Sequence, residues 1–195
     1  MSDGGGHLEL RRMEQLSNTI FGVAMTLLAY QAPREKFASG DPQWREIWTI
    51  YGAFLSTLFL SFIVAGMFWY SYHRRLAYSS HASRGEVMVH LLFLLSVILL
   101  PVTCGLYGNN YDSSHATMLY SINLLLIGLF NVVLWVMAVA PRGDWARVVT
   151  PLVPLVLFVL ALVACIIDPR WPKFIWPLGF LAPFVSAYIE RRERR

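Results

Sequence analysis

The stretch that decides the fold is residues 87–111, which read VMVHLLFLLSVILLPVTCGLYGNNY. This run contains no Asp, Glu, Lys or Arg. A helix of about 20 apolar residues spans the roughly 30 Å hydrocarbon core of a bilayer. Residues 87–111 therefore predict a transmembrane helix, and the chain is best divided by the same criterion on either side of them.

Five further uncharged runs lie at 15–33, 47–72, 113–141, 148–167 and 174–189. Each predicts a span, although the last one is short and contains Pro177 and Pro183. We therefore predict an all-α membrane protein in which residues 1–195 form a single six-helix domain. The predicted spans are residues 14–32, 46–72, 87–108, 115–139, 147–167 and 171–189.

The composition agrees with a membrane protein. Hydrophobic residues make up 56% of the chain and charged residues 14%, against roughly 25% charged residues in soluble domains. Two cysteines are too few for a disulfide scaffold. The net charge of +4 comes from basic residues between the apolar runs, where they do not form a basic stripe, so we expect no nucleic-acid partner.

The basic residues also predict the orientation. With six spans both termini lie on one side, and the loops and tails of that side hold eleven Lys and Arg residues, against five on the opposite side. By the positive-inside rule both termini are cytoplasmic. The first apolar run is not followed by a small-residue cleavage site, so we expect it to remain as a helix of a multi-pass protein of the cell membrane.

Ionisable residues inside a membrane mark proton relays and coupled transporters, and none of the six runs contains Asp, Glu, Lys or Arg. No catalytic or nucleotide-binding motif is present, so we expect neither an enzyme nor a metal or other cofactor. His90 is expected to hydrogen-bond a neighbouring helix rather than bind metal. Cys104 and Cys165 are expected to fill the core.

Residues 103–108, with the sequence TCGLYG, are similar to the carbonyl-lined filter of tetrameric potassium channels. One residue too many separates the two glycines, however, and the stretch is needed to complete a span. We therefore predict a glycine-rich helix end here and no re-entrant filter loop.

The first span carries the most informative motif. Arg12 is followed by Leu16-Ser17-Asn18 and then by a helix rich in Ile, Ala, Thr and Leu. This order resembles the signature of the transmembrane protein 175 family of potassium channels, in which Arg and three residues precede Phe-Ser-Asp. Further patches similar to the family follow in the same order, at residues 68–74, 91–101 and 120–126. The chain departs from the motif at Leu16 and Asn18.

The resemblance implies a homotetramer in which the first helix of each subunit lines a central pore without a carbonyl filter. It implies that potassium ions are the permeant species. The positions that match the family's narrow pore residues are Val23, Leu27 and Tyr30. Thr26 matches a hydroxyl position linked to potassium preference.

The spacing of the first helix is compatible with this role. Thr19, Val23, Leu27 and Tyr30 follow i, i+4, i+8 and i+11, so they share one helix face. Rings of Val and Leu around an axis would form an apolar collar that gates ions by dewetting. The alternative is that this face packs against other helices or lipid.

At the cytoplasmic end of the same helix, we predict a network that holds the helix angle. Its members are Arg12, Ser17, Asn18 and His73. In the alternative interpretation, Ser17 and Asn18 are only capping groups at the membrane boundary.

The prediction is therefore a potassium-preferring cation channel, with a lipid bilayer and further copies of the chain as its partners. The alternatives are a cation or proton transporter of the same fold and a non-conducting membrane scaffold. The absence of carboxylates from the predicted spans argues against the transporter, and the altered motif at residues 16–18 supports the scaffold.

Overall fold

The computed structural model describes residues 3–34, 41–78 and 83–181. Within these ranges all regular structure is helical, which confirms the all-α prediction. The elements are α1 (Asp3–Tyr30), α2 (Trp44–Leu76), α3 (Arg84–Asn109), α4 (Ser114–Val139), η1 (Ala140–Arg142), η2 (Trp145–Val148), α5 (Val149–Ile167), α6 (Pro172–Ile175) and η3 (Trp176–Leu181). Residues 182–189 of the predicted sixth span lie outside the described ranges. The single-domain organisation of residues 1–195 stays a prediction.

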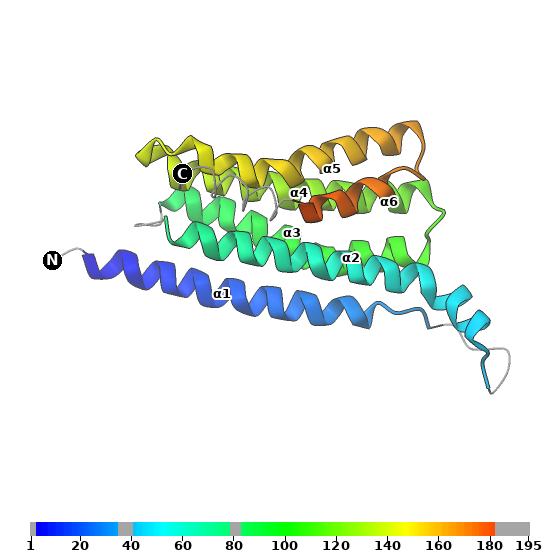
Figure 1. The fold of residues 1–195 in the computed structure, drawn as a ribbon. Helices are drawn as coiled ribbons and strands as arrows, with labels where there is room; N and C mark the ends of the chain where they lie inside the picture. The colour runs from blue at the N-terminus through cyan, green and yellow to red at the C-terminus, as the bar shows by residue number, and fades with distance from the viewer. Residues whose placement is uncertain (1–2, 35–40, 79–82, 182–195) are drawn as a thin grey trace, which may run out of the picture.

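The long helices α1 to α5 lie side by side in an elongated bundle (Figure 1). Helix α3 contacts α1, α2 and α4, and α4 contacts α5, so α3 and α4 form the middle of the bundle. Helix α1 lies along one edge, against α2 and α3. Helix α5 lies on the opposite side of the bundle, so one face of α1 has no partner among residues 3–34, 41–78 and 83–181 (Figure 1).

Four segments of the described chain are long and apolar enough to cross a membrane. They are Trp44–Leu76, Arg84–Asn109, Ser114–Arg142 and Trp145–Ile167. They coincide with four of the six predicted spans. Helix α1 is 28 residues long but does not belong to this group, because polar side chains such as Asn18, Thr19 and Thr26 interrupt its apolar sequence.

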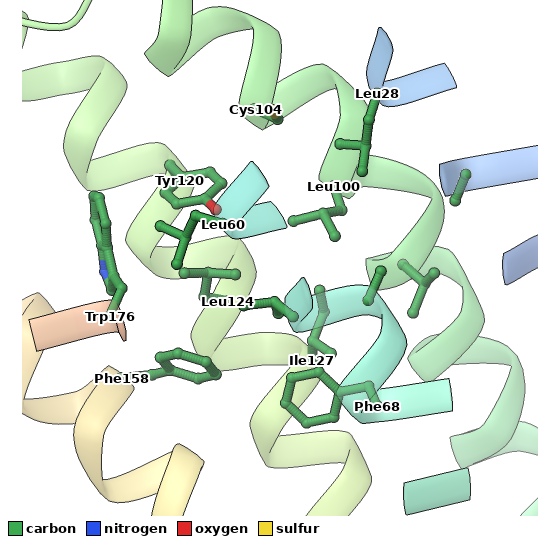
Figure 2. Packing of buried hydrophobic residues seen from close by; sticks show 14 of the residues in the cluster. Leu28, Leu60, Phe68, Leu100, Cys104, Tyr120, Leu124, Ile127, Phe158 and Trp176 are labelled. Atoms are coloured by element: carbon green, nitrogen blue, oxygen red, sulfur yellow. The ribbon is translucent and has the colours of Figure 1, made fainter. Parts of the chain in front are cut away.

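The core lies between all five long helices and η3, and Tyr120 and Trp176 pack against each other within it (Figure 2). The Tyr120 ring lies 4.9 Å from the Trp176 ring, and its hydroxyl is 2.8 Å from Ser61 Oγ. Trp176 also packs edge-on against Tyr107. Buried aromatic side chains of this size contribute several kilocalories of packing free energy, so Trp176 fixes η3 to the bundle although Pro177 follows it.

The junction between α2 and α3 differs from the prediction. The spans were expected to end at residue 72 and to begin at residue 87, which placed Arg75 and Glu86 in a loop. The helices instead continue to Leu76 and start at Arg84, and Arg75 Nη1 donates to Glu86 Oε1 at 2.9 Å. Their side chains are only 1% and 7% exposed, because the two opposite charges compensate each other inside the bundle.

Candidate functional site

Helix α1 has two different faces. Ser17, Phe21, Ala24 and Leu28 are buried and recur every three or four residues, as expected for one face of an α-helix. Phe21 packs against Phe93 of α3 with ring centroids 5.9 Å apart. This face attaches α1 to the bundle and so determines which side chains point away from it.

The opposite face of α1 holds the predicted pore residues. Val23, Leu27 and Tyr30 are 51%, 43% and 76% exposed, and Thr19 and Thr26 are also exposed. The structure thus brings these side chains to one face of α1 that is exposed in the described part of the chain. It contains one chain, so the pore roles of these residues stay predictions.

The hydroxyl of Thr26 is oriented by its own helix. Thr26 Oγ1 donates to the carbonyl oxygen of Val23 at 2.8 Å. A hydroxyl oxygen that gives away its single proton keeps its lone pairs as acceptors. Thr26 therefore presents an oxygen that is able to coordinate a cation.

Asn18 is held by α2. Trp69 Nε1 donates to Asn18 Oδ1 at 3.0 Å, and the Trp69 ring lies 4.4 Å from the His73 ring. His73 Nδ1 in turn donates to the Trp69 carbonyl oxygen at 3.0 Å. Asn18 and His73 are therefore joined through Trp69, a residue that the predicted network did not include.

Ser17 belongs to a second, buried group. Its Oγ donates to the Met13 carbonyl at 2.7 Å and lies 2.9 Å from His90 Nε2. Because the single hydroxyl proton is used on Met13, His90 donates to Ser17 through its Nε2 proton. The His90 ring stacks on Tyr72 with centroids 5.2 Å apart.

In place of the predicted four-residue network, α1 makes two hydrogen-bonded contacts with its neighbours, and the packed rings of His73, Tyr72 and His90 connect them. Asn18 binds α2 and Ser17 binds α3. Arg12 is exposed, and within the described part of the chain it is not joined to either contact. The partners Trp69 and His90 lie 51 and 73 residues away from Asn18 and Ser17, so no local pattern identifies them.

The buried Arg75–Glu86 pair lies next to these contacts and was missed by the sequence analysis. Arg75 Cζ lies 5.3 Å from the centre of the Tyr72 ring, which stacks on His90. The sequence does contain one indication that α3 begins before residue 87. Ser83 and Glu86 have the spacing of a helix capping box, and Ser83 Oγ does accept from the Glu86 amide at 3.1 Å.

Changing Asn18 to Asp is expected to alter open probability and to introduce a pH dependence that the parent lacks at this position. A carboxylate would accept from Trp69 in a charge-assisted bond, which is roughly twice as strong as a neutral one. Single-channel recordings of both forms between about pH 5 and 8 measure this, since carboxylates and histidines titrate in or near that range. Asn18→Ala, which removes the acceptor, is the control. Superimposable records for parent and Asp variant at every pH would contradict the prediction.

Four apolar spanning segments, with a more polar helix attached at the edge, define a multi-pass helical membrane protein. Comparisons with known proteins specify it further. Residues 12–101 match the model of the family described as "Endosomal/lysosomal potassium channel TMEM175". This match covers 90 of the 195 residues, so the chain is similar to this family of potassium channels over nearly half of its length.

A solved structure has the same fold. It is the crystal structure of a lysosomal potassium-selective channel TMEM175 homolog from Chamaesiphon minutus, with a TM-score of 0.74 and 19% sequence identity. The match covers 92% of this chain and 97% of that chain. None of the curated proteins matches the sequence significantly.

Proposed function

We propose that this chain forms a passive, potassium-preferring cation channel in which α1 of each of four subunits lines the pore. The observation that carries the proposal is the exposed face of α1. It combines Val23 and Leu27 with the hydroxyls of Thr19 and Thr26, on the one long helix of the described chain that is too polar for a lipid-facing span. Polar groups exposed to hydrocarbon are costly, so this face is suited to other copies and to a water-filled path.

Several copies are needed because the described residues of each subunit offer a single helix of this kind, and the resemblance to the channel family implies four. Closed rotational symmetry is the usual arrangement of homo-oligomers, and it places the same helix face around one axis. Rings of Val23 and Leu27 would then form a narrow apolar collar, with Tyr30 at its outer end. The Thr26 oxygens beside the collar would supply ligands to a partly dehydrated potassium ion.

The proposal includes an orientation with both termini in the cytoplasm and a location in the cell membrane. Basic side chains support it at the end of the bundle where α1 begins: Arg11 and Arg12 of α1, Arg74 of α2 and Arg84 of α3. An excess of Arg and Lys in short loops marks the cytoplasmic side.

Flux measurements on liposomes containing the purified protein test this function against its alternatives. A channel carries potassium passively down its gradient, a cation or proton transporter requires a second ion, and a scaffold carries none. Native mass spectrometry in mild detergent tests the assembly, for which we expect a tetramer. A monomer would contradict the proposed pore.

Replacing Thr26 by Val is expected to reduce the preference for potassium over sodium several-fold without affecting assembly. Valine has nearly the same shape but lacks the oxygen that would coordinate the ion. The measurement is the reversal potential under bi-ionic conditions. Thr49→Val is the matched control, because Thr49 is another exposed hydroxyl that donates to its own helix but lies on α2, outside the proposed pore face. An unchanged reversal potential in Thr26→Val would remove this residue from the selective site.

A further inference from the structure

The TCGLYG stretch at residues 103–108 has a structural use that is different from a filter. It is helical throughout and forms the last turns of α3. A Cβ atom at Gly105 would lie 2.8 Å from Cβ and Oε1 of Gln31 and 3.0 Å from its Cγ. Real Cβ atoms do not approach other atoms so closely, so only glycine lets Gln31 pack onto α3 at this point.

Gln31 directly follows the last residue of α1, Tyr30. The last carbonyls of a helix have no partner in the helix, and its final turn frays easily. Here the backbone nitrogen of Gln31 is 3.3 Å from the carbonyl oxygen of Leu28. The backbone nitrogen of Ala32 is 3.4 Å from the carbonyl oxygen of Ala29. These long bonds hold the end of α1 only weakly, although the largely exposed Tyr30 depends on it for its position.

Neighbouring helices supply the missing support. Asn109 Nδ2 of α3 donates to the Gln31 carbonyl oxygen at 3.1 Å, one turn after Gly105 on the same helix. Tyr51 of α2 donates to the Pro33 carbonyl oxygen at 3.3 Å. The segment after α1 is thus held in two ways. Gln31 packs closely on Gly105, which has no side chain, and the carbonyl oxygens of Gln31 and Pro33 accept hydrogen bonds from α3 and α2.

We propose that Gly105 and Asn109 are positioning residues that set the place of Tyr30 at the outer end of the pore. This inference rests on the proposed function, because it assumes that α1 lines a conduction path. The two residues act through Gln31 and do not contact the ion. The same displacement in four subunits would converge on the pore axis, so a small movement of Gln31 would change the narrow region.

The first test compares two alanine substitutions in the same stretch. In Gly105→Ala the new methyl group displaces Gln31, and we expect the potassium-to-sodium permeability ratio or the unitary conductance to change by about twofold or more. In Gly108→Ala the methyl group meets Phe54 of α2, 3.0 Å from its Cδ2 and 3.1 Å from its Cα. This control should lower thermal stability but leave permeation close to that of the parent.

Two further variants separate positioning from a general packing defect. Gln31→Gly removes the three atoms nearest to the new methyl group. Ion permeation through the double variant Gly105→Ala with Gln31→Gly should therefore be closer to that of the parent than permeation through Gly105→Ala alone. Asn109→Asp keeps the shape of the side chain but removes its donor, and it should change permeation in the same direction as Gly105→Ala. Equal effects of Gly105→Ala and Gly108→Ala on permeation would overturn the proposal.

A readout that needs no conduction separates this inference from the proposed function. A nitroxide label on Tyr30→Cys reports the mobility of the end of α1, and the native cysteines Cys104 and Cys165 are buried. The label should become more mobile in Gly105→Ala and Asn109→Asp but not in Gly108→Ala. Unchanged mobility in the first two variants would refute the positioning role. A parent without potassium flux would instead refute the proposed channel.

Discussion

Replacing Leu27 by serine is expected to raise the passive potassium flux per assembly about tenfold, which corresponds to lowering the barrier by ~1.4 kcal/mol. A ring of leucine side chains offers a dehydrated cation no ligands, whereas a ring of hydroxyls keeps water in the narrow region. Leu27 is 43% exposed on the unpartnered face of α1, so the substitution does not open a cavity in the subunit core. Unitary conductance in planar bilayers measures the effect.

Leu160→Ser is the matched control for this prediction. Leu160 is similarly exposed, but it lies on α5, on the side of the bundle opposite α1 (Figure 1). The same chemical change there should leave the conductance unaltered. If both variants conduct like the parent, the collar is not the barrier.

Replacing Glu86 by Leu is expected to destabilise the protein by about 3–5 kcal/mol, the usual cost of removing one partner from a buried ion pair. Arg75 would keep its charge in the interior without the carboxylate 2.9 Å away. The reason is desolvation, since a guanidinium that is 1% exposed has no water to replace the lost partner. Thermal and denaturant unfolding in detergent measure the loss.

Two controls identify the cause of that loss. In Arg75→Met combined with Glu86→Leu neither charge is left, so most of the stability should return. Asp144→Ala removes the partner of Arg147 in a half-exposed ion pair, and it should cost no more than about 1 kcal/mol. A double variant as unstable as Glu86→Leu would show that the unpaired charge of Arg75 is not the cause of the loss.

The four most apolar spans could be predicted from the sequence because transfer into hydrocarbon depends on local composition alone. The ends of α2 and α3 could not. Dividing the chain at charged residues places Arg75 and Glu86 outside the membrane helices, but each compensates the charge of the other. That compensation depends on a contact between two helices, and hydropathy does not contain this information.

The candidate site, too, could be predicted only in part from the sequence. The exposed face with Val23, Leu27 and Tyr30 follows from helical periodicity, and the structure places these side chains together. The supports of α1 do not follow from periodicity. Asn109 is 78 residues away from Gln31, and the role of Gly105 becomes visible only when the end of α1 is placed beside it.

The location of α1 at the edge of the bundle has a consequence for evolvability. One side of this helix packs against the bundle through Phe21, Ala24 and Leu28 and so contributes to the stability of the subunit. The side chains on the other side are exposed and make few contacts within the described part of the chain. Mutations on the free side can accumulate without unfolding the protomer, and in an assembly each of them is copied once per subunit. In the proposed channel, such mutations would change the ionic preference while the fold of the subunit stays unchanged.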